Sequence, residues 1–187
     1  MNIVGPTYSL SSNRAATQSC GGWMLRQIEP GNEKSGFYLQ QCPGLTRIAT
    51  AGAEIRGAWW TGSRAFVVAG STLYELGSNW ALTSRGSLMT STGRVEFSQG
   101  LTQLAIVDGS HGYTYTLSTD TFSTITSADF YPSKTTGHLD ERFLFVNEGT
   151  QQFFWSGTSS AGSFDPLAFQ TVLDMRGGIV GLIVDHR

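Results

Sequence analysis

The sequence predicts an all-β protein whose strands form antiparallel, propeller-like blades. Short apolar runs rich in Val, Ile, Phe, Tyr, Trp and Thr are separated by Gly pairs and Asp-Gly, which is typical of strands and tight turns. The runs also repeat, because residues 64–70 realign with 103–109 and again with 142–147, and each step is 39 residues long. A repeat of about 40 residues that contains several antiparallel strands is typical of β-propeller blades.

Each repeat is expected to contain three or four strands, joined by tight turns such as Gly70-Ser71 and Asp108-Gly109. The expected strands are 55–60, 64–68 and 72–76 in the first repeat, 95–99, 103–107 and 113–117 in the second, and 137–140, 142–146 and 152–156 in the third. Residues 179–184 are expected to open a fourth set.

These strands divide a partial propeller at residues 51–187 into blades. The expected blades are 51–90, 91–130 and 131–170, followed by the start of a further blade at 171–187. Propellers have about four to eight blades, so this propeller is expected to be incomplete in the chain. Either the sequence is part of a longer protein or another chain completes the arc. We favour the first explanation, because an open propeller exposes a strand edge.

Residues 1–50 lie outside the repeat and are expected to form an extended N-terminal arm. Turn-forming pairs such as Gly5-Pro6 and Gly21-Gly22 interrupt any long regular element there. The apolar side chains of the arm need burial, so we expect the arm to pack on the propeller or on a neighbouring subunit. Cys20 and Cys42 could form a disulfide, but free thiols are favoured because two cysteines do not make a disulfide framework.

The composition disfavours electrostatic DNA binding and membrane insertion. Charged residues make up 14% of the chain, the formal net charge is −2, and the 12 basic residues are scattered. Salt-sensitive attraction to phosphates is therefore not expected, and any contact with DNA is expected to be non-specific. No apolar run approaches the roughly 20 residues that span a bilayer, and the N-terminus does not follow the pattern of a secretion signal.

No catalytic residue is predicted. Asp140 and Glu141 are adjacent, so in a strand they would face opposite sides and could not act jointly on a glycosidic bond. They are expected to be an exposed turn carboxylate and a partner for Arg142. Ser63 is expected to lie in a hairpin connection, because it lacks a Gly-x-Ser-x-Gly elbow. The remaining carboxylates that we considered are scattered along the chain: Glu54, Glu96, Asp129 and Asp174.

No metal or cofactor site is predicted either. His111, His138 and His186 do not have the paired spacing of metal ligands. The segment Asp108-Gly109-Ser110 is similar to the start of a calcium loop but lacks the further oxygen ligands, and a hairpin turn explains it. Gly177-Gly178 precedes an expected strand, whereas a phosphate-binding loop needs a following helix.

Three tryptophans are candidates for a contact surface, namely Trp59, Trp60 and Trp80. They could anchor a subunit interface or stack on a sugar ring. Aromatic residues at strand positions more often fill the core of a blade, so this assignment competes with a purely structural one.

Several segments together resemble the N-terminal part of the proteins of a known family. They are 5–8, 35–39, Cys42-Pro43-Gly44-Leu45, Ile55-Arg56-Gly57, 164–169, 179–182 and Asp185-His186-Arg187. In this order they are similar to segments of the tail-hub proteins of short-tailed bacteriophages, which are also called packaged-DNA stabilisation proteins or tail accessory factors. The resemblance covers nearly the whole chain.

The resemblance implies a structural virion protein of the phage tail that is assembled in the host cytoplasm and is not an enzyme. Such a tail hub joins the portal and its adaptor to distal parts such as fibres, spikes or a needle, and helps to retain packaged DNA. The resemblance also implies a homo-oligomeric ring, expected to be a hexamer, with no cofactor. The alternative is a carbohydrate- or protein-binding β-propeller module, because fold alone does not decide function.

Overall fold

The computed structural model describes residues 23–27, 37–41, 47–173 and 177–184. The chain forms two compact units, Met1–Arg47 and Ile48–Arg187. In the first unit, β1 (Trp23–Gln27) pairs antiparallel with β2 (Phe37–Gln41), a pairing that the expectation of an extended arm did not include. Cys20 and Cys42, and the rest of the expected arm before residue 47, lie outside the described residues.

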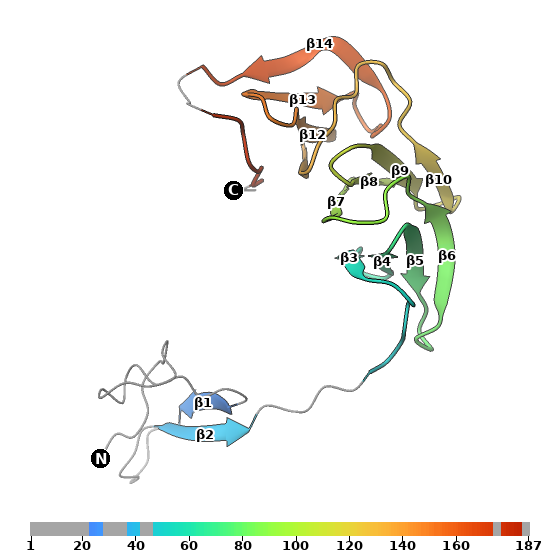
Figure 1. Ribbon diagram of the computed structural model, residues 1–187, viewed down its shortest axis with the longest axis vertical. Helices are drawn as coiled ribbons and strands as arrows, with labels where there is room; N and C mark the ends of the chain where they lie inside the picture. Colours follow the sequence, from blue (N-terminus) through green and yellow to red (C-terminus); the bar gives the residue numbers. More distant parts are fainter. Residues whose placement is uncertain (1–22, 28–36, 42–46, 174–176, 185–187) are drawn as a thin grey trace. The chain divides into compact units, whose positions relative to one another are not determined.

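The second unit contains three four-stranded antiparallel sheets, which we call blades one, two and three (Figure 1). In each blade the strands are neighbours in chain order, and the part of the chain that the structure describes contains no helix. The strands are β3 (Ile55–Trp60), β4 (Ala65–Ala69), β5 (Thr72–Leu76) and β6 (Leu82–Ser87) in blade one, β7 (Glu96–Gln99), β8 (Gln103–Val107), β9 (Gly112–Thr116) and β10 (Thr121–Thr124) in blade two, and β11 (Thr136–Leu139), β12 (Arg142–Val146), β13 (Gln152–Ser156) and β14 (Phe164–Thr171) in blade three. The all-β, propeller-like prediction is confirmed.

Each blade ends in a fourth strand that the sequence analysis did not locate, namely β6, β10 and β14. The strand expected at residues 179–184 was wrong, because these residues have no strand geometry. The Ile179 amide donates to the Thr150 carbonyl (2.9 Å) and the Leu182 amide donates to Thr135 Oγ1 (3.4 Å), which is no ladder to a neighbouring strand. The expected blade boundaries, including a further blade that starts at 171–187, stay predictions.

The blades are arranged like those of a propeller. The first strands β3, β7 and β11 lie next to one another, and the last strands β6 and β10 are also neighbours. Figure 1 shows β3 and β7 on the inner side of the arc that the blades form, and β6 and β10 on its outer side. The loops at one end of the inner strands are therefore the β3–β4, β7–β8 and β11–β12 hairpins.

Two hydrophobic cores lie between the blades, and β8 contributes to both. Leu104 and Ile106 belong to the core between blades one and two, while Ala105 and Val107 belong to the core between blades two and three. Successive side chains of a strand point to opposite faces, so a strand packed on both faces is apolar throughout. In the second core the ring of Phe130 makes edge-on contacts with three phenylalanine rings, Phe145, Phe154 and Phe164.

The repeat extends to the backbone of the turns. Trp80, Asp120 and Ser159 have positive φ angles of 64°, 54° and 57°, and they follow one another at intervals of 40 and 39 residues. All three lie between the third and fourth strands of their blade. A left-handed conformation is uncommon for residues other than glycine, so its recurrence marks a conserved turn geometry within the chain.

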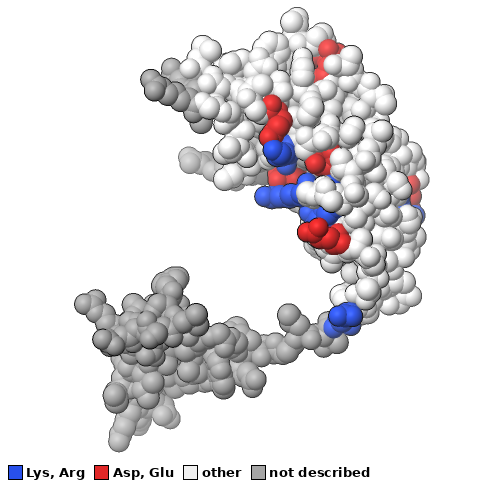
Figure 2. All heavy atoms as spheres, in the orientation of Figure 1, with Lys and Arg blue, Asp and Glu red and all other residues white. Residues whose placement is uncertain are grey.

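The surface of the second unit carries few charges. Figure 2 shows that most of its visible face is uncharged and that one group of acidic and basic side chains lies side by side on the inner side of the arc. In the described residues no helix is long and apolar enough to cross a membrane.

Candidate functional site

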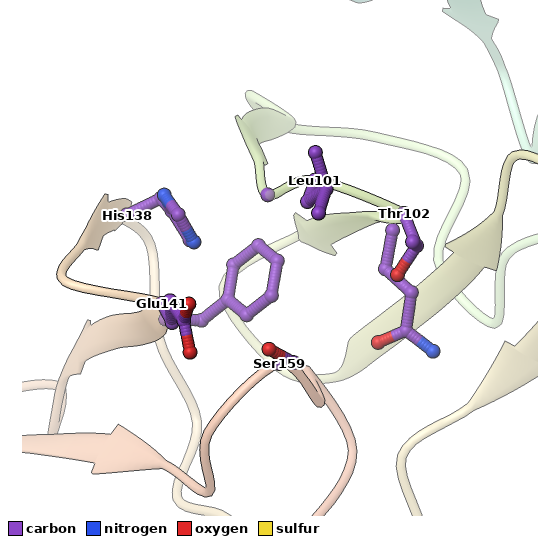
Figure 3. Close-up of a pocket in the computed structure, with 8 residues that line it drawn as sticks. Leu101, Thr102, His138, Glu141 and Ser159 are labelled. Atoms are coloured by element: carbon purple, nitrogen blue, oxygen red, sulfur yellow. The ribbon is translucent and has the colours of Figure 1, made fainter.

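A small cavity lies at the end of blades two and three, among the inner hairpins (Figure 3). We call it the hairpin cavity. Its volume is about 70 Å³, and its lining comes from the β7–β8 hairpin, the β11–β12 hairpin and the turn before β14. The lining residues are Gly100, Leu101, Thr102, Gln103, His138, Glu141, Phe143 and Ser159. In Figure 3, His138 and Glu141 stand on one side of the cavity, and Leu101 and Thr102 stand on the other.

The inner strands also border a more open groove of about 440 Å³. Its wall includes Trp59, whose indole Nε1 donates to Gln99 Oε1 (2.9 Å), so that this tryptophan is tied to blade two. Leu182 and Val184 of the C-terminal segment line the same groove. The C-terminal segment of this chain therefore forms part of the wall of the groove.

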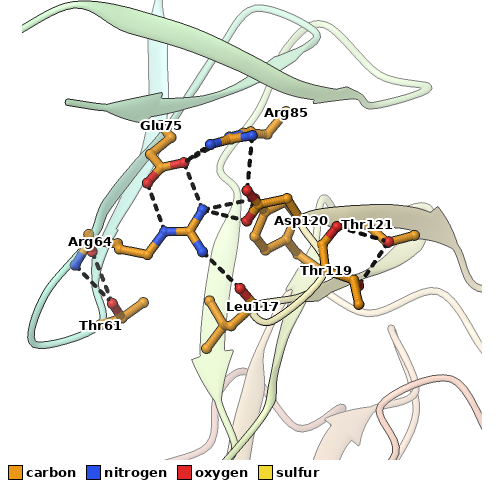
Figure 4. A network of polar contacts seen from close by, with 9 residues as sticks. Thr61, Arg64, Glu75, Arg85, Leu117, Thr119, Asp120 and Thr121 are labelled. Atoms are coloured by element: carbon orange, nitrogen blue, oxygen red, sulfur yellow. Dashed lines mark hydrogen bonds and ion pairs between the residues drawn. The ribbon is translucent and has the colours of Figure 1, made fainter.

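A network of charged side chains joins blades one and two at their outer edge (Figure 4). Arg64 Nε donates to Glu75 Oε1 (2.7 Å), and Arg64 Nη2 donates to Asp120 Oδ1 (2.6 Å). Arg85 contacts the same two carboxylates, at 2.6 Å from Glu75 and 3.1 Å from Asp120. The Tyr115 hydroxyl donates to Asp120 Oδ1 (2.9 Å). Two cations and two anions thus neutralise one another.

The network perturbs the ionisation of its members. The hydrogen bond from Arg64 lowers the pKa of Glu75, against the effect of burial, and Arg85 adds to the lowering. Hydrogen bonds from Arg64 and Tyr115 lower the pKa of Asp120 in the same way. The pKa of Arg64 is raised chiefly by Glu75. All of these shifts favour the charged forms, so none of the three groups is poised to transfer a proton. The network therefore links the two blades by ion pairs.

Arg56 lies inside the segment Ile55-Arg56-Gly57 and is buried, with 6% of its surface exposed. Its guanidinium donates to the carbonyls of Gly70, Thr90, Thr92 and Gly93, and to Thr90 Oγ1, at 2.6–2.8 Å. Thr90, Thr92 and Gly93 belong to the connection between β6 and β7. Arg56 therefore fixes the passage of the chain from blade one to blade two.

The Asp108 side chain is a second buried anchor. It accepts hydrogen bonds from Thr90 Oγ1 (2.6 Å), the Tyr113 hydroxyl (2.8 Å) and the backbone amides of Ser110 (3.0 Å) and His111 (2.7 Å). Burial on its own would raise the pKa of Asp108, but these hydrogen bonds outweigh it and lower the pKa. Both carboxylate oxygens of Asp108, which was considered as a calcium ligand, thus accept hydrogen bonds from within this chain. In the described residues no group of three or more His, Cys, Asp or Glu side chains is placed to hold a metal ion.

The expectation of an exposed turn carboxylate is confirmed, while the expected strand 137–140 ends one residue earlier, at Leu139. Asp140 and Glu141 have positive φ angles, 47° and 64°, and they form the two-residue turn between β11 and β12. Arg142 donates to the carbonyl of Ser156 (3.2 Å), so it is not the partner that was expected for the neighbouring carboxylates. Both acidic side chains are exposed.

The other candidate residues are dispersed. Trp60 and Trp80 are exposed, at 61% and 53%, whereas Trp59 packs against the first core. His138 stacks edge-on against Phe143, and Glu96 accepts a hydrogen bond from Thr135 Oγ1 (2.8 Å). Ser63 lies in the β3–β4 hairpin, while Glu54 and Asp129 lie in loops. Asp174 and His186 lie outside the described residues.

The hairpin cavity was missed by the sequence analysis. The 39-residue repeat was the signal that could have located it, because the hairpins that form the cavity are repeat-equivalent.

Comparisons with solved structures give weak likenesses. The N-terminal domain of Nup159 aligns with a TM-score of 0.46 at 10% identity, over 78% of this chain and 35% of that chain. YCF48 bound to D1 peptide aligns with a TM-score of 0.43 at 12% identity, over 68% of this chain and 43% of that chain. PorZ of Porphyromonas gingivalis aligns with a TM-score of 0.34 at 16% identity, over 68% of this chain and 23% of that chain. The chain thus spans less than half of each of these structures.

Comparison with protein families is decisive. No curated protein sequence matches the chain significantly. A family model described as Bacteriophage P22 Gp10, beta-propeller, matches residues 24–187, which is most of the chain and includes all three blades. The chain therefore belongs to this phage stabilisation family of β-propeller proteins.

Proposed function

We propose that this chain is the tail hub of a short-tailed phage, a protein that joins the portal and adaptor to the distal tail parts and helps to retain packaged DNA. The observation that carries the proposal is the family match over residues 24–187, which indicates a structural or stabilising role in a phage particle. The family match indicates only this general role. The tail-hub role, the contact with the adaptor and the assembly in the host cytoplasm are our proposals beyond it.

The contacts between blades support a mechanical role. A connector under internal DNA pressure has to resist deformation, and close-packed interiors have low compressibility. Here the blades are joined by two continuous apolar cores and by the buried Arg56, which hydrogen-bonds four backbone carbonyls. We propose no catalytic function and no cofactor for this scaffold.

The proposed assembly is a homo-oligomeric ring, and specifically a hexamer. A surface with few charges favours contacts made by apolar and hydroxyl side chains. Exposed leucines such as Leu167 and Leu173 are available for such contacts. The partners proposed besides further copies are the portal adaptor and a fibre, spike or needle protein, while packaged DNA is touched only non-specifically.

The native mass of the full-length gene product, alone and mixed with preassembled adaptor rings, tests this proposal. A closed ring, or capture on the adaptor, is the expected result. A monomer that does not bind adaptor rings at micromolar concentration would contradict the proposal. Salt-dependent DNA binding in the micromolar range would contradict the expectation that this chain has no salt-sensitive attraction to DNA phosphates.

A second candidate function is a carbohydrate- or protein-binding propeller module. The observation that favours it is the exposure of Trp60 and Trp80, whose indole rings could stack on a sugar. A glycan array tests it, with Trp60→Ala and Trp80→Ala as matched variants. Glycan binding by the monomer that either variant abolishes would favour this module over the tail hub.

A further inference from the structure

We propose that the hairpin cavity and the adjacent Asp140-Glu141 turn form a docking site for a segment of another protein that carries a Lys or Arg beside a small apolar side chain. The inference goes beyond the proposed tail-hub function and does not depend on it. It rests on the shape of the cavity, on the charge at its rim and on a comparison between the two blade junctions.

The cavity offers an apolar floor and an apolar rim. Its floor is the ring of Phe143, which is 1% exposed, and its rim carries Leu101, which is 92% exposed. The volume of about 70 Å³ has room for a side chain but not for a large ligand. An exposed large apolar side chain beside a pocket, such as Leu101, is typical of protein contact sites, since an occupant removes that side chain from water.

The rim also carries negative charge that forms no ion pair with a basic side chain in the described residues. In the described residues, Glu75, Asp120, Glu96 and Glu148 each form an ion pair with an Arg or Lys side chain. No such pair involves Asp140 or Glu141 within the same part of the chain, and Arg142 is directed to the carbonyl of Ser156. A basic side chain is therefore the complementary partner for this turn.

The internal repeat allows the side chains at equivalent positions of the two blade junctions to be compared. At the junction of blades one and two, the guanidinium of Arg64 bridges to Asp120 of the next blade (2.6 Å). The residues 39 positions later are Gln103 and Ser159, and both line the hairpin cavity. Gln103 Oε1 accepts from the backbone amide of Ala161 (2.9 Å), so a neutral side chain stands in the second junction where Arg64 stands in the first. The negative charge of the second junction comes instead from the Asp140-Glu141 turn, so a Lys or Arg from a partner would form there the kind of ion pair that Arg64 and Asp120 form in the first junction.

Titration of the ¹⁵N-labelled full chain tests the proposal. The probe is the blocked peptide acetyl-Gly-Val-Lys-Val-Gly-amide, and the same peptide with Glu in place of Lys is the control. We expect saturable shifts in the amides of residues 100–103, 138–142 and 159 with the lysine peptide, which weaken as salt is added. We expect no saturable shifts with the glutamate peptide.

Three variants locate the interaction. Asp140→Asn combined with Glu141→Asn removes the charge and keeps residues that tolerate the left-handed conformation. This double variant is expected to bind the lysine peptide about tenfold more weakly, because two exposed ion pairs are lost. Leu101→Ser is expected to weaken binding without affecting the fold, since the side chain is exposed. Glu54→Gln, an exposed carboxylate before β3, is the matched control and should bind normally.

Three results would overturn the proposal. The first is equal binding of the lysine and glutamate peptides. The second is unchanged affinity of the Asp140→Asn, Glu141→Asn variant when its amide spectrum shows a native fold. The third is the absence of saturable shifts from the parent chain in the millimolar range of lysine peptide.

Discussion

Arg56 illustrates how one side chain determines the path between two blades. A guanidinium has five N–H donors, and the five hydrogen bonds that Arg56 makes are all to groups of this chain. Four of the acceptors are backbone carbonyls, and the buried guanidinium would be costly to leave without them. The arginine of the Ile55-Arg56-Gly57 segment is therefore explained by folding.

Arg56→Lys is expected to lower the free energy of unfolding by about 2 kcal/mol. Lysine keeps the charge but offers three donors from a single point, so at least two of the present hydrogen bonds are lost. Urea unfolding at neutral pH measures the change. Arg94→Lys is the control, because the Arg94 side chain is 80% exposed, and it should stay within about 0.5 kcal/mol of the parent. Equal stability of the two variants would show that the Arg56 hydrogen bonds are replaceable.

Glu75 gives a prediction about pH. Its pKa in the folded protein is lowered by Arg64 and Arg85, so its contribution to stability is present above the unfolded pKa of about 4 and is lost as the pH falls through the folded pKa. Glu75→Gln lacks this contribution at every pH. The stability difference between parent and Glu75→Gln should therefore be largest near pH 6 and shrink towards pH 3, as measured by urea midpoints. A difference that stays constant over this range would contradict the assignment.

At the scale of the strand, Gly57 permits the close approach of blade one to blade two. A Cβ atom at this position would lie 2.3 Å from the backbone oxygen of Val95, which is impossible without a shift of the backbone. Gly57→Ala is expected to cost about 2 kcal/mol of stability through overpacking. Gly181→Ala is the matched control, since a Cβ there meets nothing within 4 Å. Similar thermal unfolding midpoints for the two variants would refute the prediction.

The inner three strands of each blade could be predicted because their apolar runs repeat, whereas the outer strands could not. Strand β10 has the sequence Thr121-Phe122-Ser123-Thr124, in which a single apolar side chain gives no periodicity. Strand β14 contains Pro166, which argues against a central strand but is tolerated in an edge strand. Conversely, residues 179–184 are apolar enough for a strand, but within the described part of the chain no strand forms a ladder with them.

The hairpin cavity depends on elements that are distant in sequence. Gly100 and Phe143 come from different repeats, and a Cβ at Gly100 would lie 2.7 Å from the Phe143 ring, so this contact requires a glycine. The sequence analysis expected an exposed turn carboxylate at Asp140 and Glu141 but paired one of them with Arg142, and it did not place both on the turn. Their common position on one turn follows from two consecutive left-handed residues, which composition and hydrophobic periodicity do not indicate.

At the scale of the whole second unit, β8 couples the blades. Its residues Leu104–Val107 are all 0% exposed, and they alternate between the two interblade cores. A local opening that exposes β8 has to separate it from both neighbouring blades, whereas β6, β10 and β14 each have one partner strand in their sheet. The stability of backbone hydrogen bonds should therefore decrease from the centre of blade two to the outer strands.

Native-state hydrogen exchange monitored by mass spectrometry tests this gradient. Amides of β8 are expected to exchange slowest, and those of β10 and β14 faster, because opening an edge strand breaks one ladder and exposes little of either core. Leu104→Ala and Phe143→Ala, which create cavities in the first and second cores, should both accelerate exchange in β8. If each substitution accelerated exchange only in its own outer neighbour, blade one or blade three, and left β8 unchanged, the blades would be independent units and β8 would not couple them.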